Sequence, residues 1–209
     1  MELEADIKKA LEELRKNKER KFDQTVDLII NLQKFDVKKQ NISLFLNIPY
    51  KIKDKKIAGF LETKNKDVDT ITPSEFKNYD DKKTLRKLAK RFDFFIAQAN
   101  LMPKVATVFG RVLGPAGKMP SPQMGIMMNA DEKNIKALKE KINNSVKIKI
   151  KEASVKLAIG KQSMKNDEIA ENILSVYNAV QKVLTKGKDN IKNIEIKFTM
   201  TKPQKIPIR

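Results

Sequence analysis

The sequence contains no cysteine and no histidine among its 209 residues. Without cysteine, the chain has no disulfide, no thiolate nucleophile and no thiolate metal ligand. Without histidine, it lacks the usual general base at neutral pH and the commonest metal ligand in proteins. The remaining carboxylates are scattered as solvated helix charges rather than paired. We therefore expect no enzyme, no metal site and no cofactor.

Long apolar segments are also missing. No apolar run approaches the roughly 18 residues that a membrane-spanning helix needs. The N-terminal segment MELEADIKKALEELRKNKERK has no apolar region of the kind found in secretory signals. Hydrophobic residues nevertheless make up 40% of the chain, which argues against disorder. These features predict a soluble cytoplasmic protein without a membrane partner, long enough for one domain or two small ones.

Positive charge is the strongest signal that is present. The chain has 44 basic and 26 acidic residues, a net charge of +18. The excess is +1 in residues 1–50, +9 in residues 51–145 and +8 in residues 146–209. Such an excess is typical of proteins that bind a polyanion, most often a nucleic acid. The alternative is a genome whose composition or growth temperature favours lysine throughout.

The first fifty residues have two kinds of hydrophobic period. Apolar residues at helical spacing in residues 3–14 predict an amphipathic helix. Strict alternation in residues 26–32 and again in residues 42–48 predicts two strands. Because only the polar stretch QKFDVKKQ separates these strands, we expect them to pair as a hairpin. Pro49 ends the second strand.

The same alternation returns after residue 145. Strands are predicted at 146–150, 154–161 and 193–200, with a long helix between the last two. For this helix we expect Asn166 as the N-cap and Gly187 as the C-terminal stop. The alternating segments at the two ends of the sequence are expected to form halves of one antiparallel sheet with helices on one face.

Residues 51–145 have a different pattern. KIAGFLET and FDFFIAQ are continuous apolar runs, which are typical of strands buried on both faces. Helical patterns follow or precede them, so this segment predicts a mainly parallel, Rossmann-like three-layer α/β domain. The overall prediction is an α/β protein in which an α+β split domain (1–50 and 146–209) contains an inserted domain (51–145). Chain crossings near Pro49 and Ser145 would form a hinge.

The loop GRVLGPAGKMPSPQMG, residues 110–125, contains four of the chain's seven glycines and three of its eight prolines. A phosphate-binding loop of the Walker type requires G-x-x-x-x-G-K-[ST] after a strand. Here Val112 stands where the first glycine is needed, and Met119 replaces the magnesium-binding hydroxyl. A helix is also predicted before the loop in place of a strand. Nucleotide binding is therefore excluded at this loop.

The three prolines, together with Gly114, Gly117 and Gly125, instead predict a stiff, shaped surface loop. Its candidate contact residues are Arg111, Gly114, Pro115, Gly117, Lys118 and Pro120. Exposed backbone N–H groups beside cations suit contact with a phosphate backbone. The alternative is a purely structural crossover.

Four segments resemble one family. GRVLGPAGKMPSP is similar to the characteristic loop of the ribosomal protein "L one" family, the stalk protein of the large subunit, in its archaeal form. RKFDQTVDLIINL at 20–32, LAIGKQSMKNDEIAENI at 157–173 and IEIKFTMTKP at 194–203 resemble three further family segments. They keep the family's order and approximate spacing over nearly the whole chain.

The resemblance implies a split first domain with an inserted second domain. It also implies binding to large-subunit rRNA at the mobile stalk, near the tRNA exit site, by a structural protein of the cytoplasmic ribosome. Some members repress translation by binding their own mRNA. The implied partners are therefore large-subunit rRNA, the protein's own mRNA and exit-site tRNA, with a monomer off the ribosome. The inserted domain is expected to add little to rRNA specificity.

The resemblance also transfers candidate RNA-contacting residues onto matching positions. They are Lys21, Phe22, Thr25, Gly160, Lys161, Ser163, Thr199, Met200 and Thr201. By periodicity, Phe22 and Met200 are in phase with a buried face, so each is either a core residue or an exposed contact. Thr199 lies on the polar face of its strand, where a hydroxyl can meet a ribose 2′-OH.

Two positions depart from the family pattern. Thr201 stands where the family usually has glycine, so its Cβ and hydroxyl are expected to crowd the approach to RNA. Ala116 replaces an arginine, and Lys118 is expected to compensate for that missing cation. Two competing hypotheses remain: a basic nucleic-acid chaperone without sequence preference, and a nucleotide-dependent enzyme.

Overall fold

A computed structural model describes residues 2–18, 20–36, 42–150 and 152–207. The chain divides into two compact units. Unit 1 comprises Met1–Ile52 and Asn144–Arg209, and unit 2 comprises Lys53–Asn143. These boundaries lie within two residues of those expected from the sequence. The fold is the predicted α/β type, with several sheets and helices packed against them.

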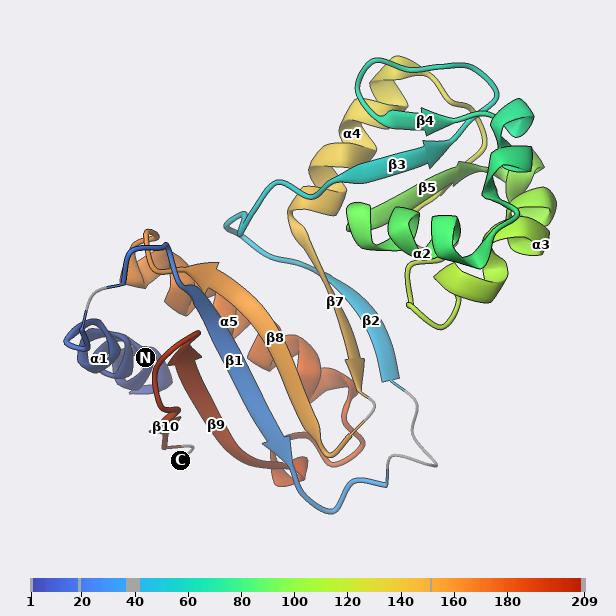
Figure 1. Ribbon diagram of the computed structural model, residues 1–209. Helices are drawn as coiled ribbons and strands as arrows, with labels where there is room; N and C mark the ends of the chain where they lie inside the picture. The colour runs from blue at the N-terminus through green and yellow to red at the C-terminus, as the bar shows by residue number, and fades with distance from the viewer. Residues whose placement is uncertain (1, 19, 37–41, 151, 208–209) are drawn as a thin grey trace. The chain divides into compact units, whose positions relative to one another are not determined.

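Unit 1 contains two helices and six strands among its described residues (Figure 1). In chain order they are α1 (Glu2–Arg15), β1 (Thr25–Leu32), β2 (Ile42–Asn47), β7 (Ser145–Ile150), β8 (Ser154–Lys161), α5 (Asn166–Val183), β9 (Ile191–Phe198) and β10 (Gln204–Ile206). A short 3₁₀ helix, Gly187–Asn190, precedes β9. The predicted helices and strands of this unit are all present.

The pairing of the strands differs from the prediction. The predicted hairpin between β1 and β2 is wrong, because β1 pairs antiparallel with β8 on one side and β9 on the other. β2 pairs instead with β7 in a separate two-stranded sheet. The prediction of one sheet was therefore also wrong: the main sheet has the order β10-β9-β1-β8. Part of the supposed hairpin connection, residues 37–41, lies outside the described residues.

The core of unit 1 lies between the main sheet and its two long helices. Alternate residues of β1 point inward, namely Val26, Leu28, Ile30 and Leu32. They meet the apolar stripe of α1 and that of α5, which lies behind the sheet in Figure 1. Full burial of one such aliphatic side chain contributes roughly 1.5–3 kcal/mol. One face of the sheet is thus covered by helices, whereas the ends of its strands are not covered by this packing.

Both ends of α5 differ in detail from the prediction. The N-cap is Lys165, one residue earlier than expected, and its backbone N–H donates to Glu168 Oε2 at 3.2 Å. Asn166 instead lies in the first turn, where its Oδ1 accepts a hydrogen bond from Arg15 Nε at 2.7 Å. The helix ends at Val183, before Gly187, whose φ of 53° starts the following turn.

Unit 2 has a four-stranded parallel sheet of order β4-β3-β5-β6. Its elements are β3 (Ile57–Phe60), β4 (Asp69–Ile71), α2 (Lys82–Arg91), β5 (Phe94–Gln98), α3 (Met102–Leu113), β6 (Ile126–Met127) and α4 (Glu132–Asn143). Two 3₁₀ helices, Pro73–Tyr79 and Ala99–Leu101, lie between them. The predicted parallel α/β arrangement is confirmed.

The sheet of unit 2 is covered on both faces. Phe60 and Phe95 point to the side of α2 and α3, where they stack with ring centroids 5.7 Å apart. Phe109 of α3 lies 4.7 Å from Phe60, so aromatic rings fill this layer. Ile57 and Ile96 alternate to the opposite face, on which α4 lies (Figure 1). Three layers result.

The two chain crossings are held by side-chain amides. Asn172 of α5 is fully buried; its Oδ1 accepts from the Tyr50 N–H at 3.0 Å, and its Nδ2 donates to Tyr50 O at 2.9 Å. At the second crossing, Asn143 Oδ1 accepts from the Lys55 N–H at 3.0 Å within unit 2. At the next residue, the backbone carbonyl of Asn144 accepts from the Ile48 N–H at 2.7 Å within unit 1.

Within the described ranges, no helix combines the length and the apolar character that crossing a bilayer requires.

Candidate nucleic-acid interface

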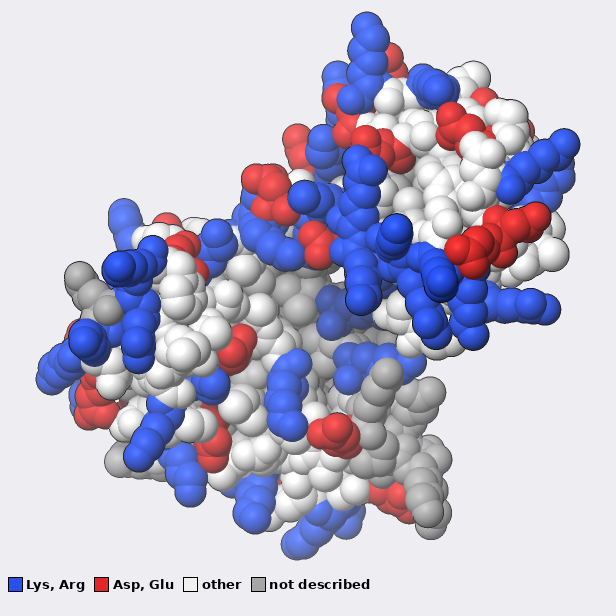
Figure 2. Space-filling model, viewed as in Figure 1, with Lys and Arg blue, Asp and Glu red and all other residues white. Residues whose placement is uncertain are grey.

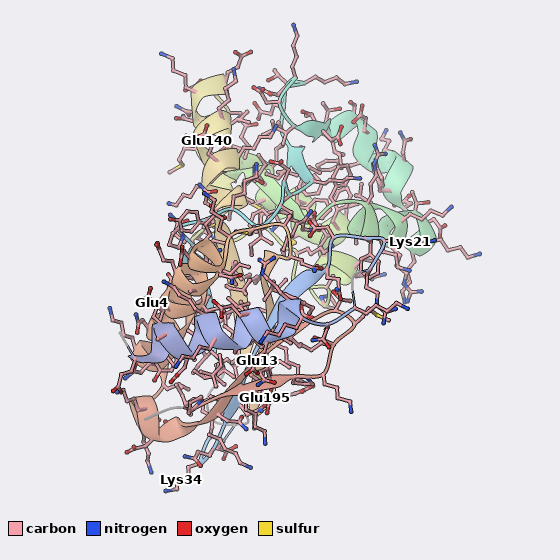
Figure 3. The ribbon with its side chains drawn as sticks, turned by 90° about the vertical axis from the view of Figure 1, so that its left-hand side faces the viewer. Glu4, Glu13, Lys21, Lys34, Glu140 and Glu195 are labelled. Carbon is pink, nitrogen blue, oxygen red and sulfur yellow. The ribbon has the colours of Figure 1, made fainter. Side chains whose placement is uncertain are left out.

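Most of the residues predicted to contact RNA lie at one end of the main sheet of unit 1. β1 begins there, whereas β8 and β9 end there. The register pairs Thr25 with Lys161, and Val26 with both Gly160 and Phe198. Figure 3 shows Lys21 and Lys34 at opposite ends of β1, with Lys21 on the side of this site. We call this region the sheet end.

A buried glutamine organises the sheet end. Gln24 is 2% exposed, and its Oε1 accepts from the Met200 N–H at 3.1 Å. Its Nε2 donates to Gln162 Oε1 at 3.1 Å, and its backbone carbonyl accepts from the Gln162 N–H at 2.8 Å. One side chain therefore joins the start of β1 to the segments that follow β8 and β9.

An acidic residue fixes the predicted lysine and serine. Asp23 accepts two hydrogen bonds from Ser163, one from its N–H at 3.0 Å and one from its hydroxyl at 2.9 Å. The Lys161 ammonium lies 3.6 Å from Asp23 Oδ2. The charge of Lys161 is thus partly neutralised within the protein. Its position relative to Ser163 is set by this shared carboxylate.

The hydroxyl groups of Thr199 and Thr201 also bond within the protein. Thr199 Oγ1 accepts from the Thr25 N–H at 3.1 Å, which extends the pairing of β1 with β9 by one residue. Thr201 Oγ1 accepts from the Phe198 N–H at 2.9 Å and donates to Phe198 O at 3.3 Å. The Thr201 side chain is therefore folded back onto the strand that precedes it.

Arg15 holds the turn between β8 and α5. From the last turn of α1, its guanidinium donates to Asn166 Oδ1 at 2.7 Å, to Gln162 O at 2.8 Å and to Met164 O at 2.6 Å. Three directed bonds from one planar group define the path of this turn. Arg15 thus stabilises the conformation of the sheet end through its hydrogen bonds to the turn between β8 and α5.

Two large apolar side chains are exposed at the sheet end. Phe22 is 51% exposed and Met200 is 57% exposed. The alternative in which they belong to the core therefore does not hold. Within the described residues, only Met128 and Val183 are other large hydrophobic residues with comparable exposure. An exposed ring and thioether beside hydroxyls and cations provide stacking surfaces for unpaired bases.

Gly160 has a packing role that the sequence did not reveal. It is buried, and a Cβ built on it would lie 3.1 Å from Ile169 Cγ1 and 3.5 Å from Met164 Sδ. Glycine at this position lets α5 approach β8 closely. Gly160 therefore helps to set the position of the neighbouring Lys161, and its own backbone is buried.

One carboxyl group next to the site has a shifted pKa. Burial raises the pKa of Asp27, and the ammonium of Lys197 opposes that shift. The two residues are direct partners across β1 and β9. Asp27 is two residues from Thr25 along β1, and Lys197 is two residues before Thr199. An acidic and a basic side chain therefore lie beside the pair of threonine hydroxyls.

The predicted loop residues form a second region in unit 2. Gly117 and Gly125 have φ of 69° and 140°, as turns that need glycine require, while Pro120 is buried. Lys118 does not act as a free cation: its ammonium donates to Ala89 O at 2.7 Å and Phe92 O at 2.8 Å. The expectation that it compensates for the cation missing at Ala116 is wrong, because it caps the end of α2.

Sequence reasoning missed three residues that build the sheet end, namely Arg15, Asp23 and Gln24. The last two lie inside the motif KFDQTVD, between the residues that were selected. Their side chains bond within the protein, so chemistry alone did not single them out. In the part of the chain that the structure describes, no cluster of carboxylates is arranged to hold a metal ion.

Comparison with known proteins identifies the relatives of this chain. Residues 14–202 match the model of the ribosomal protein L1p/L10e family. The chain is 37% identical to large ribosomal subunit protein uL1 of Nanoarchaeum equitans, over 93% of this chain and 94% of the relative. It is 36% identical to the uL1 of Pyrobaculum islandicum, with 94% and 90% covered, and 34% identical to that of Pyrococcus abyssi, with 88% and 86% covered. The resemblance seen in the four sequence segments is thus confirmed, and the chain belongs to the ribosomal protein L1p/L10e family.

Proposed function

We propose that this protein binds large-subunit rRNA at the mobile stalk, near the tRNA exit site, through the sheet end of unit 1. As a member of a family of ribosomal proteins, it is a structural component of the large subunit rather than an enzyme. It therefore works in the cytoplasm, on the ribosome. The contact with rRNA and the residues that make it are the proposal.

One observation carries this proposal: the sheet end combines exposed stacking groups with a rigid polar frame. Phe22 and Met200 are exposed, while Gln24, Asp23 and Arg15 fix the backbone around them. Single-stranded or irregular RNA is recognised by stacking, by 2′-OH contacts and by shape. Groups that are already ordered lose little conformational entropy on binding, which favours a specific complex.

The same surface would also serve translational repression. An mRNA segment that presents the same shape as the rRNA site would occupy the sheet end in its place. Because one surface serves both RNAs, they should compete directly for the free protein. We propose that the protein's own mRNA is such a competitor. Exit-site tRNA is a further proposed partner of the assembled stalk. Off the ribosome, the protein is proposed to be a monomer.

The test is competition binding at two salt concentrations, with the stalk-base fragment of large-subunit rRNA as the labelled probe. Unrelated duplex RNA of equal length is the competitor. We expect the fragment to be preferred by about 10³-fold, equivalent to about 4 kcal/mol. A general chaperone would bind both RNAs equally, and both affinities would fall together as salt rises.

The double variant Lys161→Ala with Thr199→Ala should lower the preference for the fragment by at least about tenfold, since each loses a polar contact to RNA. A matched control is Lys66→Ala with Thr63→Ala, which changes the same residue types at exposed positions of unit 2. If the two variants prefer the fragment to the same degree as the unmodified protein, the sheet end is not the rRNA site.

A further inference from the structure

Unit 2 contains an open groove of about 640 Å³ between α2 and the end of α3 with its following loop. Its walls carry the cations Lys82, Arg86, Lys90 and Arg111. Short apolar side chains also line it, including Ala89, Val112 and Pro115. Among the described residues, no carboxylate lines it. We call this feature the α2 groove.

The cations of the α2 groove are regularly spaced. Lys82, Arg86 and Lys90 follow one another at intervals of four residues, so they lie on one side of α2 about 6 Å apart along its axis. α2 contains six basic residues among ten and no acidic residue. Figure 2 shows lysine and arginine side chains gathered over this helix. The row faces Arg111, which comes from the last turn of α3.

These four cations have no partner among the described residues. Each is exposed, and none forms an ion pair or a side-chain hydrogen bond within the described ranges. Lys118, which also lines the groove, differs because two backbone carbonyl groups accept its protons. Close like charges repel one another, and a bound anion removes that repulsion.

The shape of the groove strengthens its positive potential. A concave surface lined in part by apolar side chains concentrates the field of its cations. The apolar side chains are also suited to the apolar faces of riboses or bases, while the cations meet successive phosphates. An evenly spaced row of charges matches a repeating polyanion better than it matches a single small anion.

We propose that the α2 groove binds the phosphodiester backbone of RNA without sequence preference, as a second RNA site separate from the sheet end. Lys82, Arg86 and Lys90 contact successive phosphates along one strand, and Arg111 contacts the same strand from the opposite wall. This inference rests on the groove alone, and it holds whether or not the sheet end recognises rRNA.

The test uses the full-length protein and a fluorescein-labelled oligouridine, followed by fluorescence anisotropy. The groove variant carries Lys82→Gln, Arg86→Gln, Lys90→Gln and Arg111→Gln together. The control variant carries Lys77→Gln, Lys104→Gln, Lys133→Gln and Lys141→Gln, four exposed cations of unit 2 that lie outside the groove. Both variants remove the same charge. Because every changed side chain is exposed, both are expected to fold, which circular dichroism checks.

We expect the groove variant to bind oligouridine about tenfold more weakly or worse, and the control variant to lose less than about threefold. The slope of log affinity against log salt should flatten by about 3 in the groove variant, at roughly 0.7 per phosphate contact. Equal losses in the two variants would show that only overall charge acts, and this would overturn the proposal. An unchanged groove variant would overturn it as well.

Two further arms separate the possible ligands and sites. Sodium phosphate should displace oligouridine no better than sodium chloride at equal ionic strength; selective displacement by phosphate would mean a site for free anions and would reject the RNA proposal. The groove variant should keep its preference for the rRNA fragment, while Lys161→Ala with Thr199→Ala should keep its affinity for oligouridine. Failure of one proposal is thereby distinguished from failure of the other.

Discussion

The sheet end of unit 1 and the α2 groove of unit 2 are both basic, but their cations are arranged in opposite ways. At the sheet end, Lys161 lies beside Asp23 and Arg15 is bonded to three oxygen atoms. In the groove, Lys82, Arg86 and Arg111 have no such partner among the described residues. The charges of the sheet end stabilise the conformation of the protein itself, whereas those of the groove can bind an anionic ligand.

This difference separates two contributions to RNA binding. Charges that are fixed by internal bonds position hydroxyls and stacking groups, and so favour one RNA shape over others. Charges without an internal partner give affinity that depends strongly on salt and little on sequence. The three predictions below test how independent the two units are, starting with the largest expected effect.

Loss of the buried amide of Asn172 should affect unit 1 alone. In Asn172→Ala, the N–H and C=O of Tyr50 lose their partners, as does Ile159 O, which also accepts from Asn172 Nδ2. Buried polar groups left unpaired cost about 1–3 kcal/mol each, so unit 1 should lose about 3 kcal/mol in its free energy of unfolding. Hydrogen exchange of amides in β1 and β3 measures the two units separately.

The control for that experiment is Asn134→Ala on α4, which removes one weak exposed hydrogen bond of 3.5 Å. It should cost less than about 0.5 kcal/mol. Binding of oligouridine should survive Asn172→Ala, because the α2 groove lies in the other unit. Equal loss of protection in β1 and β3 would mean that the units unfold as one and that the comparison does not hold.

Two glycine-to-alanine changes should have opposite signs. Gly160→Ala places a Cβ 3.1 Å from the buried Ile169 side chain, which should lower the stability of unit 1 by about 1 kcal/mol. Gly110→Ala lies inside α3, where the new Cβ would have no heavy atom within 4 Å outside its chain neighbours and the helix's own backbone. There it should raise the stability of unit 2 by about 0.5–1 kcal/mol, since alanine favours the helix. Thermal denaturation checks both signs.

The third prediction concerns pH. Burial lowers the pKa of Lys55 from 10.5 to about 8; the charge of Asp93 opposes this shift and that of Lys53 adds to it. Between these two pKa values the unfolded chain binds more protons, so the stability of unit 2 should increase as pH rises from about 8 to 10.5. After allowance for solvent, the gain should be about 1 kcal/mol.

Lys55→Met removes the titrating group and should remove this part of the pH dependence. The readout is the difference in unfolding free energy between the two proteins at pH values on either side of the window. Lys66→Met, at an exposed position of the same unit, is the control and should leave the dependence unchanged. If Lys55→Met behaves like the control, the Lys55 ammonium is not desolvated.

The periodicity of hydrophobic residues predicted the helices and strands of this fold but not which strands pair with each other. β1 was recognised from its alternation, yet it pairs with β8 and β9, which lie more than 120 residues later in the sequence. The neighbour along the chain, β2, pairs with β7 instead. Pairing at such separation depends on packing against α1 and α5, and no local pattern encodes it.

Site residues whose side chains face solvent could be predicted from the sequence. Those whose side chains bond within the protein could not. Lys161, Ser163 and Thr199 were named correctly as residues of one region, although their contact with RNA stays a prediction. Gln24 was missed because its amide bonds inside the protein. Lys118 was assigned to phosphate because sequence cannot tell a cation that caps a helix from one that is free.

The adjacent residues Asn143 and Asn144 bear on how the chain tolerates changes of length. Asn143 is bonded within unit 2 and Asn144 within unit 1, so this crossing has no spare residue. A single deletion there would force one of the two hydrogen bonds to break. Homologues and engineered variants should therefore keep the length of this crossing constant.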